Sequence, residues 1–227
     1  MKSVAAIVVA AGKGLRLKSK IPKPLVNINN KPAIIYSLQV LSREPRIKEI
    51  IIVANLANIK DIQKVVKKYK ISKVKKIILG GARRQDSVFN GLRLAGGDIV
   101  LIHDAARPFI ERKIVSSAIA QAQKTGAAIV GVPVKATVKA VGSSQGLVVR
   151  ATLDRSRLWE IQTPQVFKKE LLLAAYRKFG NTKVTDDASL VEKLGQKVRI
   201  VLGEYKNIKV TTPEDLILAE AIAKSLR

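Results

Sequence analysis

The chain has 227 residues, and its 42 lysines and arginines against 17 aspartates and glutamates give a formal net charge of +25 at pH 7. Cysteine is absent and His103 is the single histidine, which argues against disulfide frameworks, cysteine nucleophiles, histidine-based triads and the usual transition-metal sites. This length suits one well-buried core, so we expect residues 1–227 to form a single domain.

The positive charge favours an anionic ligand but does not choose among phosphates, nucleic acid and anionic membrane. Aromatic residues make up only 4% of the chain, fewer than a nucleic-acid surface with interleaved aromatics would use. We therefore interpret most of the charge as solubilising surface and keep a basic nucleic-acid-binding protein as a remote alternative. No apolar run approaches the roughly 18 residues of a spanning helix, and we expect a cytoplasmic protein with no membrane partner.

Short β-branched apolar runs alternate with segments of helical period along the chain. Strands are expected at residues 4–9, 47–54, 74–79, 98–103, 127–134 and 197–203. Helices are expected with Pro32 in a first turn, after Asn58, and at the Thr-Thr-Pro-Glu-Asp run that begins at Thr211. This alternation predicts an α/β, Rossmann-like fold, with a mainly parallel sheet and helices on both faces. Ligands of such folds bind at the carboxyl ends of the strands.

Residues 136–153 interrupt this pattern, because apolar and polar residues alternate with a period of two on both sides of the sequence GSSQG. The pattern predicts a β-hairpin arm at about residues 135–156. An arm with little of its own to bury against is a candidate for wrapping around a second subunit. The alternative is a hairpin that lies on its own sheet, and the sequence is compatible with both arrangements.

The segment AAGKGLRL, residues 10–17, follows the first predicted strand directly. Gly12 and Gly14 can take turn conformations closed to other residues and bring backbone N–H groups near an anion. The segment lacks the lysine–serine/threonine ending of a P-loop and the third glycine of a dinucleotide fingerprint. Arg16 lies within the segment and Lys23 shortly after it, and their donors suit a triphosphate whose charge must be neutralised during reaction. The alternative is a strand-to-helix turn with solvated basic residues.

Two later strand ends carry further candidates. The sequence GGARRQDSVFNGL, residues 80–92, places Ser87 where it could help to read a base or ribose, although a capped helix explains the same pattern. Asp104 ends a predicted buried strand, and a carboxylate among so many cations suggests Mg²⁺ binding together with phosphate. Arg107 is an alternative ion-pair partner for Asp104, and we expect His103 to pack or hydrogen-bond rather than act as a base.

Several motifs follow one another along essentially the whole chain: AAGKGLR, PKP, GGARRQDSV, HDAARP, PVKATVK, DRSRLW, QTPQ, TDDAS and NIKVT. Their order resembles that of the 4-diphosphocytidyl-2-C-methyl-D-erythritol synthases, the cytidylyltransferases of the non-mevalonate isoprenoid pathway. Each motif alone is weak evidence for a family. The whole set in this order is far more specific than any single motif.

The resemblance implies one nucleotidyltransferase domain that transfers CMP from CTP to 2-C-methyl-D-erythritol 4-phosphate, releases pyrophosphate and requires Mg²⁺. It implies that CTP is bound by Ala10, Ala11, Gly12, Gly14, Gly81, Ser87 and Asp104. It implies catalytic roles for Arg16, Lys23 and Lys209, and Asp104 as the metal ligand. Acceptor binding would fall to Arg107, Thr137, Arg155, Thr163, Thr185 and Lys209. Of these, Thr137 and Arg155 would complete the partner's site across the two-fold axis of a homodimer.

The chain departs from the family pattern at two positions. Ala136 stands where the family often has aspartate, and Pro24 where glutamine is common, while the neighbouring Thr137 and Lys23 are kept. Ala136 concerns the acceptor side, so a ribitol-5-phosphate cytidylyltransferase, with the same fold and the same use of CTP, is the nearest alternative. In either reaction the acceptor is a phosphate and needs no general base, which agrees with the scarcity of histidine and cysteine.

Overall fold

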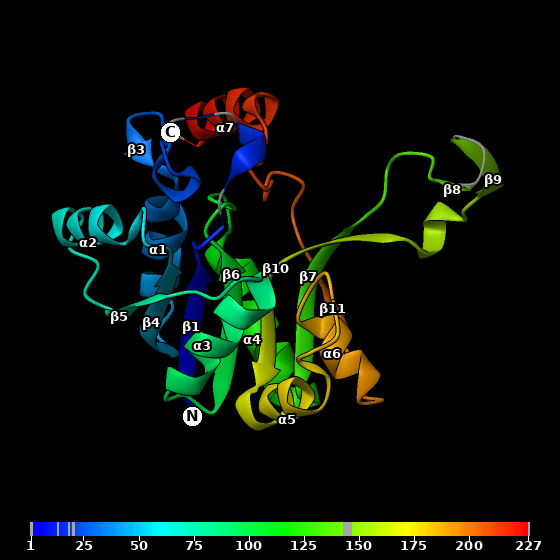
Figure 1. Cartoon of the computed structure of the whole chain (residues 1–227), viewed down its shortest axis with the longest axis horizontal. Coiled ribbons are helices and arrows are strands. Elements are labelled where there is room, and N and C mark those ends of the chain that lie inside the picture. Colours follow the sequence, from blue (N-terminus) through cyan, green and yellow to red (C-terminus); the bar gives the residue numbers. More distant parts are fainter. Residues whose placement is uncertain (1, 13, 18, 20, 143–146, 227) are drawn as a thin grey trace.

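The centre of the protein is a seven-stranded sheet in the order β11-β7-β10-β6-β1-β4-β5 (Figure 1). The structure is a computed structural model that describes residues 2–12, 14–17, 19, 21–142 and 147–226. The strands of the sheet are β1 (Val4–Val9), β4 (Ile47–Ala54), β5 (Val74–Leu79), β6 (Ile99–Asp104), β7 (Ala127–Pro133), β10 (Trp159–Lys168) and β11 (Arg199–Leu202). All six predicted strands are therefore present, with shifts of one or two residues at some ends.

Strand β10 is the exception to the parallel arrangement. It was not predicted as a strand, and it pairs antiparallel with both β6 and β7. The other neighbours in the sheet pair parallel to one another. The prediction of a mainly parallel α/β fold is thus confirmed, with one antiparallel strand inserted at its centre.

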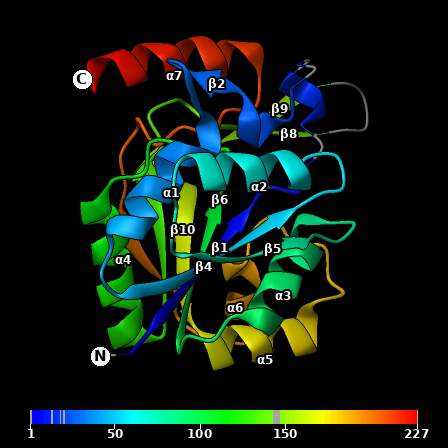
Figure 2. The same cartoon turned by 90° about the vertical axis from the view of Figure 1, so that its left-hand side faces the viewer.

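In the described part of the chain, seven α-helices connect and cover the strands, and Figure 2 shows their arrangement. They are α1 (Ala33–Arg43), α2 (Ile59–Lys68), α3 (Arg84–Leu94), α4 (Arg112–Thr125), α5 (Lys169–Phe179), α6 (Ala188–Lys193) and α7 (Pro213–Ser225). Helices α1, α2 and α4 pack against one face of the sheet, where Val4, Ala6 and Val8 of β1 point. Helices α3, α5 and α6 pack against Ala5 and Ile7 on the opposite face. Alternate residues of β1 thus enter two separate cores, as expected for a strand covered on both sides.

The predicted helix starts are close to the observed ones. Thr212 caps α7, where its hydroxyl accepts from the Asp215 N–H and Asp215 accepts from the Thr212 N–H in a capping box. Pro32 lies one position outside α1, at its N-cap, because the helix begins at Ala33. Asn58 is the N-cap residue of α2, but its side chain does not cap that helix.

The short elements gather near the carboxyl ends of the strands. They are the 3₁₀ turns η1 (Leu15–Leu17) and η2 (Lys23–Leu25), and the two-stranded pair β2 (Asn27–Ile28) and β3 (Lys31–Pro32). A third apolar cluster, which includes Ile28, Phe109 and Ala219, ties β2 to α7. This packing holds the segment after β1 over the end of the sheet.

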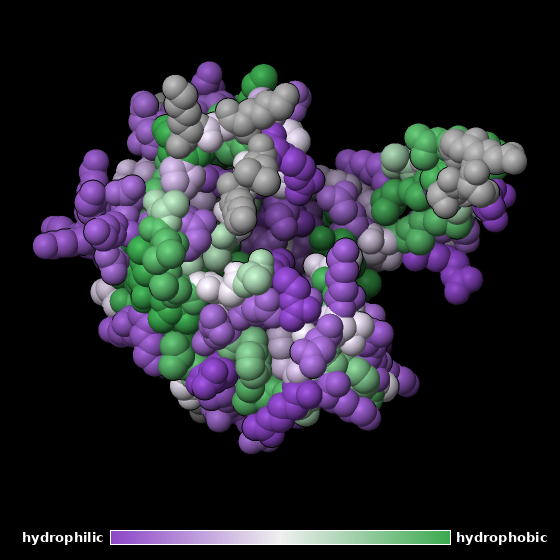
Figure 3. All heavy atoms as spheres, in the orientation of Figure 1, coloured by the Kyte–Doolittle hydropathy of each residue, from purple (hydrophilic) through white to green (hydrophobic). Residues whose placement is uncertain are grey.

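The predicted hairpin arm is present and projects away from the sheet (Figure 1). Its strands β8 (Lys139–Gly142) and β9 (Val148–Thr152) pair antiparallel, and the predicted tip at residues 143–146 lies outside the described residues. Val141, Val148 and Val149 are each more than half exposed, and Figure 3 shows apolar surface on the arm. The arm therefore does not lie on its own sheet. No described helix is long and apolar enough to cross a membrane.

Candidate functional site

The site forms where the carboxyl ends of β1, β4 and β6 meet. Val9 of β1 lies opposite Val53 of β4 and Asp104 of β6. Beyond the strands, the Ala10 N–H donates to the Val53 carbonyl at 2.7 Å and the Ala105 N–H to the Val9 carbonyl at 3.0 Å. Asp104 and the glycine-containing segment after β1 are thus placed side by side, as the sequence predicts.

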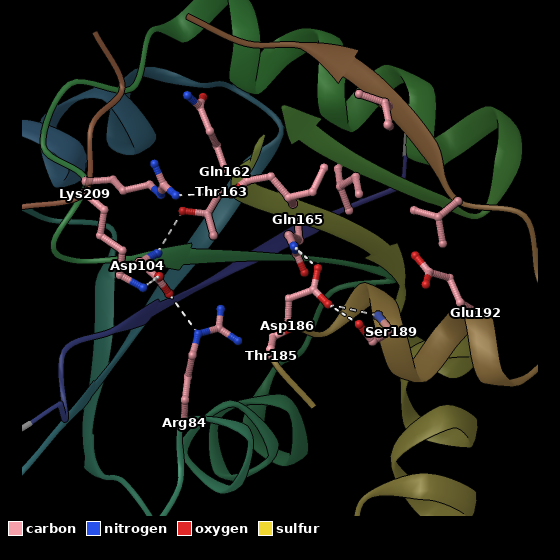
Figure 4. Close-up of a pocket in the computed structure, with 15 residues that line it drawn as sticks. Arg84, Asp104, Gln162, Thr163, Gln165, Thr185, Asp186, Ser189, Glu192 and Lys209 are labelled. Carbon is pink, nitrogen blue, oxygen red and sulfur yellow. Dashed lines mark hydrogen bonds and ion pairs between the residues drawn. The ribbon is translucent and has the colours of Figure 1, made fainter. Parts of the chain in front are cut away.

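Asp104 is the centre of a charged cluster (Figure 4). Its Oδ1 accepts from Arg84 Nε at 3.0 Å and its Oδ2 from Lys209 Nζ at 2.5 Å. The residue is 7% exposed, and burial alone would raise the pKa of its carboxyl. Arg84 and Lys209 instead hold the pKa of Asp104 well below its ordinary value, so this carboxylate stays ionised.

Arg84 is a site residue that the sequence analysis missed. Besides Asp104, it donates from Nη1 to Asp187 Oδ2 at 2.8 Å, and these two carboxylates raise its pKa despite its burial. Arg84 shares one helical face with the buried Ser87 and Val88, whereas the exposed Arg83 pairs with the half-buried Asp86. The helical period of the GGARRQDSV motif could therefore have distinguished the two arginines.

A buried hydrogen-bond network anchors Arg84. Tyr176 Oη donates to Asp187 Oδ1 at 2.6 Å, and burial followed by the Asp187 charge raises the pKa of Tyr176. Gln165 Oε1 accepts from the backbone N–H of Asp187 at 3.1 Å. Gln165 Nε2 donates to Asp186 at 2.8 Å. The QTPQ and TDDAS motifs therefore meet each other behind the charged cluster.

Arg107 is not the ion-pair partner of Asp104. Its guanidinium donates to the carbonyl of Asn207 at 2.7 Å and to that of Ile161 at 3.3 Å. Asn207 is fully buried and also donates to the Thr163 carbonyl at 3.0 Å. These contacts fix the loop that carries Lys209, so the alternative pairing considered for Arg107 is wrong.

His103 is a buried structural residue, as expected. Its Nε2 lies 2.9 Å from the Arg107 carbonyl and its Nδ1 lies 3.1 Å from Thr163 Oγ1. A carbonyl can only accept, so the proton is on Nε2 and Nδ1 accepts from the Thr163 hydroxyl. Burial lowers the pKa of His103 to about 4, which keeps the ring neutral. Thr163 Oγ1 also accepts from the Asp104 N–H at 3.1 Å, so Thr163 positions the site backbone.

Two pockets adjoin the charged cluster, and Arg107 and Lys209 line both. The first, of about 470 Å³, has Arg84, Asp104, Thr163 and Thr185 among its other lining residues. The second, of about 510 Å³, is also lined by Arg16, Thr211 and Asp215. The structure therefore brings together Arg16, Arg107, Lys209, Asp104, Thr163 and Thr185 from five separate sequence motifs.

Lys23 lies close enough to this group to be affected by it electrostatically. It is half-buried on η2, and burial, followed by the charges of Lys209 and Arg16, lowers its pKa to about 8. An incoming anion stabilises the protonated form of such a lysine, because the anion offsets the charges of both neighbouring cations. This property fits the triphosphate role expected for Lys23.

The two glycine segments contact each other. A Cβ at Gly80 would come within 2.7 Å of the Ala11 Cβ and 2.5 Å of Ser87 Oγ. The Gly81 N–H donates to Ser87 Oγ at 3.1 Å, and that hydroxyl donates to the Arg83 carbonyl at 3.2 Å. Ser87 is 2% exposed, so in this structure it holds the glycine turn in place. Gly14 has a φ of +66°, the conformation for which glycine was expected.

Within one chain, Thr137 and Arg155 lie apart from the other predicted site residues. Both are exposed, and neither lines either pocket. Arg155 lies in η3 (Arg155–Arg157), at the base of the arm, and donates to the Lys135 carbonyl at 2.7 Å.

The metal role expected for Asp104 can be compared with its surroundings. Among the described residues, no three histidine, aspartate or glutamate side chains cluster as metal ligands. Asp104 supplies one ionised carboxylate next to two cation-lined pockets. Mg²⁺ commonly binds through one or two carboxylates and completes its shell with phosphate oxygens and water. The donor set fits a magnesium ion that arrives with a nucleotide.

Comparisons with known proteins agree with this geometry. The profile of the family described as 2-C-methyl-D-erythritol 4-phosphate cytidylyltransferase matches residues 4–225. Proteins of that name from Geobacillus kaustophilus and Shouchella clausii are 44% and 46% identical to this chain, each over 97% of it and 96% of their own length. The crystal structure of 4-diphosphocytidyl-2C-methyl-D-erythritol synthase from Anaerococcus prevotii superposes with a TM-score of 0.86 at 34% identity, covering 98% of this chain and 96% of that one.

Proposed function

Because the chain belongs to the 2-C-methyl-D-erythritol 4-phosphate cytidylyltransferase family, we propose that it transfers CMP from CTP to 2-C-methyl-D-erythritol 4-phosphate in isoprenoid precursor synthesis. The structural observation that carries this proposal is the arrangement of Arg16, Arg107 and Lys209 around one pocket beside Asp104. We treat residues 1–227 as one nucleotidyltransferase domain, because the two cores share a single sheet.

The reaction exchanges one phosphorus–oxygen bond for another. A phosphate oxygen of the acceptor attacks the α-phosphorus of CTP, and the bond from that phosphorus to the bridging oxygen breaks. Pyrophosphate leaves with the electron pair of the broken bond. The nucleophile is already an anion, so no side chain has to remove a proton, and catalysis rests on positioning and charge stabilisation.

We assign the main charge stabilisation to Arg16 and Lys23. Arg16 is exposed on η1 and lines the cation-rich pocket, so its planar fork can bind phosphate oxygens. Lys23 carries a pKa lowered to about 8, so charge on the departing pyrophosphate favours its protonated form. Both cations would gain most as negative charge moves from the α-phosphorus to the leaving group.

Lys209 and Asp104 connect this chemistry to the rest of the site. Their ion pair holds Lys209 between the two pockets, which suits a residue that contacts both substrates. We propose that Asp104 also holds Mg²⁺, which would supply further charge neutralisation on the triphosphate. The metal and Lys209 then share one carboxylate.

We propose that the active form is a homodimer joined through the arm. Thr137 and Arg155 would then reach the partner's acceptor site, because the arm carries them away from the pockets of their own chain. The exposed valines of β8 and β9 support this proposal, since a two-stranded hairpin needs a packing partner to be stable. CTP is an intracellular nucleotide, so we place the reaction in the cytoplasm.

The acceptor is tested by measuring pyrophosphate release from CTP and Mg²⁺ with 2-C-methyl-D-erythritol 4-phosphate and ribitol 5-phosphate in parallel. We expect turnover with the first acceptor alone, in line with the family profile and the named relatives. Turnover with ribitol 5-phosphate alone would show that the proposed acceptor is wrong and would leave the proposed mechanism unchanged. If neither is used, steeply salt-dependent oligonucleotide binding would favour the remote alternative.

A further inference from the structure

The turn between β4 and α2 contains two asparagines that bond to each other. The Asn55 N–H donates to Asn58 Oδ1 at 2.9 Å, and the Asn58 N–H donates to Asn55 Oδ1 at 3.0 Å. Asn58 is fully buried. It occupies the N-cap position of α2 but makes no side-chain cap, so it gives up a contact that asparagine usually provides there.

The two side-chain amides instead bond to the segment after β1. Asn58 Nδ2 donates to the Ala10 carbonyl at 2.9 Å, and Asn55 Nδ2 donates to the Ala11 carbonyl at 3.0 Å. A carbonyl can only accept, so these bonds also fix which amide atom is nitrogen. In each asparagine, the side-chain oxygen thus accepts a hydrogen bond from the turn, and the side-chain nitrogen donates to one of two consecutive peptide groups.

These contacts determine where the adjacent N–H groups point. In a planar trans peptide the carbonyl and the following N–H lie on opposite sides. Fixing the carbonyls of Ala10 and Ala11 toward α2 therefore directs the N–H groups of Ala11 and Gly12 away from it. Within the described part of the chain, neither N–H donates to another residue. Two consecutive free N–H groups with a common direction form a binding site for an anion.

We infer that Asn55 and Asn58 are positioning residues that hold the N–H groups of Ala11 and Gly12 ready to bind the triphosphate of the nucleotide. They contact neither pocket, and they act through the backbone of the segment between β1 and η1. A segment held in this way does not need to reorganise on binding, so its dipoles act at full strength. The inference rests on the proposed function only in taking a nucleoside triphosphate as the ligand.

The test compares CTP with cytidine, which lacks the phosphates. In Asn58→Asp and Asn55→Asp the carboxylate can still accept from the turn but no longer donates to the Ala10 or Ala11 carbonyl. Asn58→Ala and Asn55→Ala remove the same donors without adding charge, so an effect shared by both series belongs to the lost donor. We expect the Kd for CTP to rise about tenfold in each variant, with the Kd for cytidine unchanged.

Ile62→Val is the matched control, because Ile62 is buried on α2 in the same core cluster as Ala10, and the substitution leaves the side-chain amides of Asn55 and Asn58 in place. It lowers the melting temperature while leaving the Kd for CTP unchanged. Equal losses of CTP and cytidine affinity in the asparagine variants, or no loss of CTP affinity, would overturn the inference. Asn55 is partly exposed, so its variants remain informative if those of the buried Asn58 do not fold.

These measurements separate the inference from the proposed function. Binding of CTP and cytidine is recorded by calorimetry and ligand-observed NMR without any acceptor. If the wild-type protein binds CTP but uses neither acceptor, the acceptor assignment fails. The role of the asparagines is then still decided by comparing the Kd for CTP and the Kd for cytidine between the variants and the wild type. If the wild-type protein does not bind CTP, the proposed function and the inference fail together.

Discussion

The strand-end site and the β-arm are built in opposite ways. At the site, Asp104 is 7% exposed and each of its oxygens has a cationic partner from another part of the chain. On the arm, Val148 and Val149 are 59% and 55% exposed and pair only across the hairpin. The charges of the site are thus organised within one chain, whereas among the described residues these valines stay more than half exposed. This difference is what we would expect if, as proposed above, CTP is activated within one chain and the arm of a second chain completes the acceptor site.

Loss of Lys23 is expected to have the largest effect. In Lys23→Ala a preorganised charge is removed from the triphosphate site, and we expect kcat to fall about a hundredfold, or about 3 kcal/mol of transition-state stabilisation. Steady-state pyrophosphate release measures the loss, and circular dichroism verifies that the fold is intact. A folded variant with normal activity would exclude Lys23 from the mechanism.

The division between site and arm can be tested by mixing two variants with reduced activity. Arg155→Ala is expected to lower kcat/KM for the acceptor about tenfold, because a charged hydrogen bond is lost. If Arg155 acts across the dimer, a mixed dimer of Lys23→Ala and Arg155→Ala contains one site with both residues intact. Random mixing in equal amounts then gives intact residues at about a quarter of all sites.

Activity of the mixture close to a quarter of the wild-type value would support the shared site. Activity equal to the mean of the two separate variants would show that Arg155 acts within its own chain. Refolding the two variants together in equal amounts provides the sample, which is assayed as the unseparated mixture. The wild-type protein carried through the same procedure is the control.

The pH dependence of the reaction reports on Lys23 directly. Its pKa in the free protein is about 8, so kcat/KM for CTP should fall as pH rises through this value and Lys23 loses its proton. Lys23→Arg keeps its charge across this range, so the decline near pH 8 should disappear even if the activity is lower overall. A decline that persists unchanged in Lys23→Arg would assign the titration to another group.

Behind the site, the expected effect is on thermal stability. Tyr176→Phe removes the hydrogen bond to the buried Asp187 but leaves its ion pair with Arg84. A hydrogen bond to a charged group contributes about 1.5–3 kcal/mol, which corresponds to a fall in melting temperature of roughly 3–12 °C for a domain of this size. Differential scanning calorimetry gives the shift, and an unchanged melting temperature would show that Asp187 does not depend on this contact.

The sequence predicted most of the sheet but not β10, and the reason is local. Apolar periodicity identified the strands buried on both faces, such as Val4–Val9 and Ile47–Ala54. Strand β10 contains Pro164 together with Gln162, Thr163 and Gln165, and its register with β7 shifts between Ile161 and Gln165. Proline and polar residues normally argue against a central strand. Here the side chains of Gln162, Thr163 and Gln165 line the first pocket instead of joining an apolar core.

The site itself could be predicted only in part. Asp104 was found because it ends an apolar run, and Arg16, Lys23 and Lys209 because they accompany recognisable motifs. Arg84 and the pair Asn55–Asn58 were missed as functional residues, since their partners lie far away in the sequence. Arg84 contacts Asp187, which is 103 residues away, and Asn55 contacts Ala11 across 44 residues. Such long-range partners depend on the fold and cannot be read from local spacing.

The depressed pKa of Lys23 also means that its protonated form lowers the stability of the folded protein. Burial, followed by the like charges of Lys209 and Arg16, opposes the protonated form of Lys23 only in the folded state. Lys23→Met keeps the apolar stem and removes the repulsion, so this inactive variant should melt at a higher temperature than the wild type at pH 7. The difference in melting temperature between Lys23→Met and the wild type should become smaller as pH rises from about 8 toward 10.5. In this range Lys23 has lost its proton in the folded wild type but still holds it in the unfolded chain. If Lys23 has the catalytic role that we propose, selection for activity and selection for thermostability favour different residues at position 23.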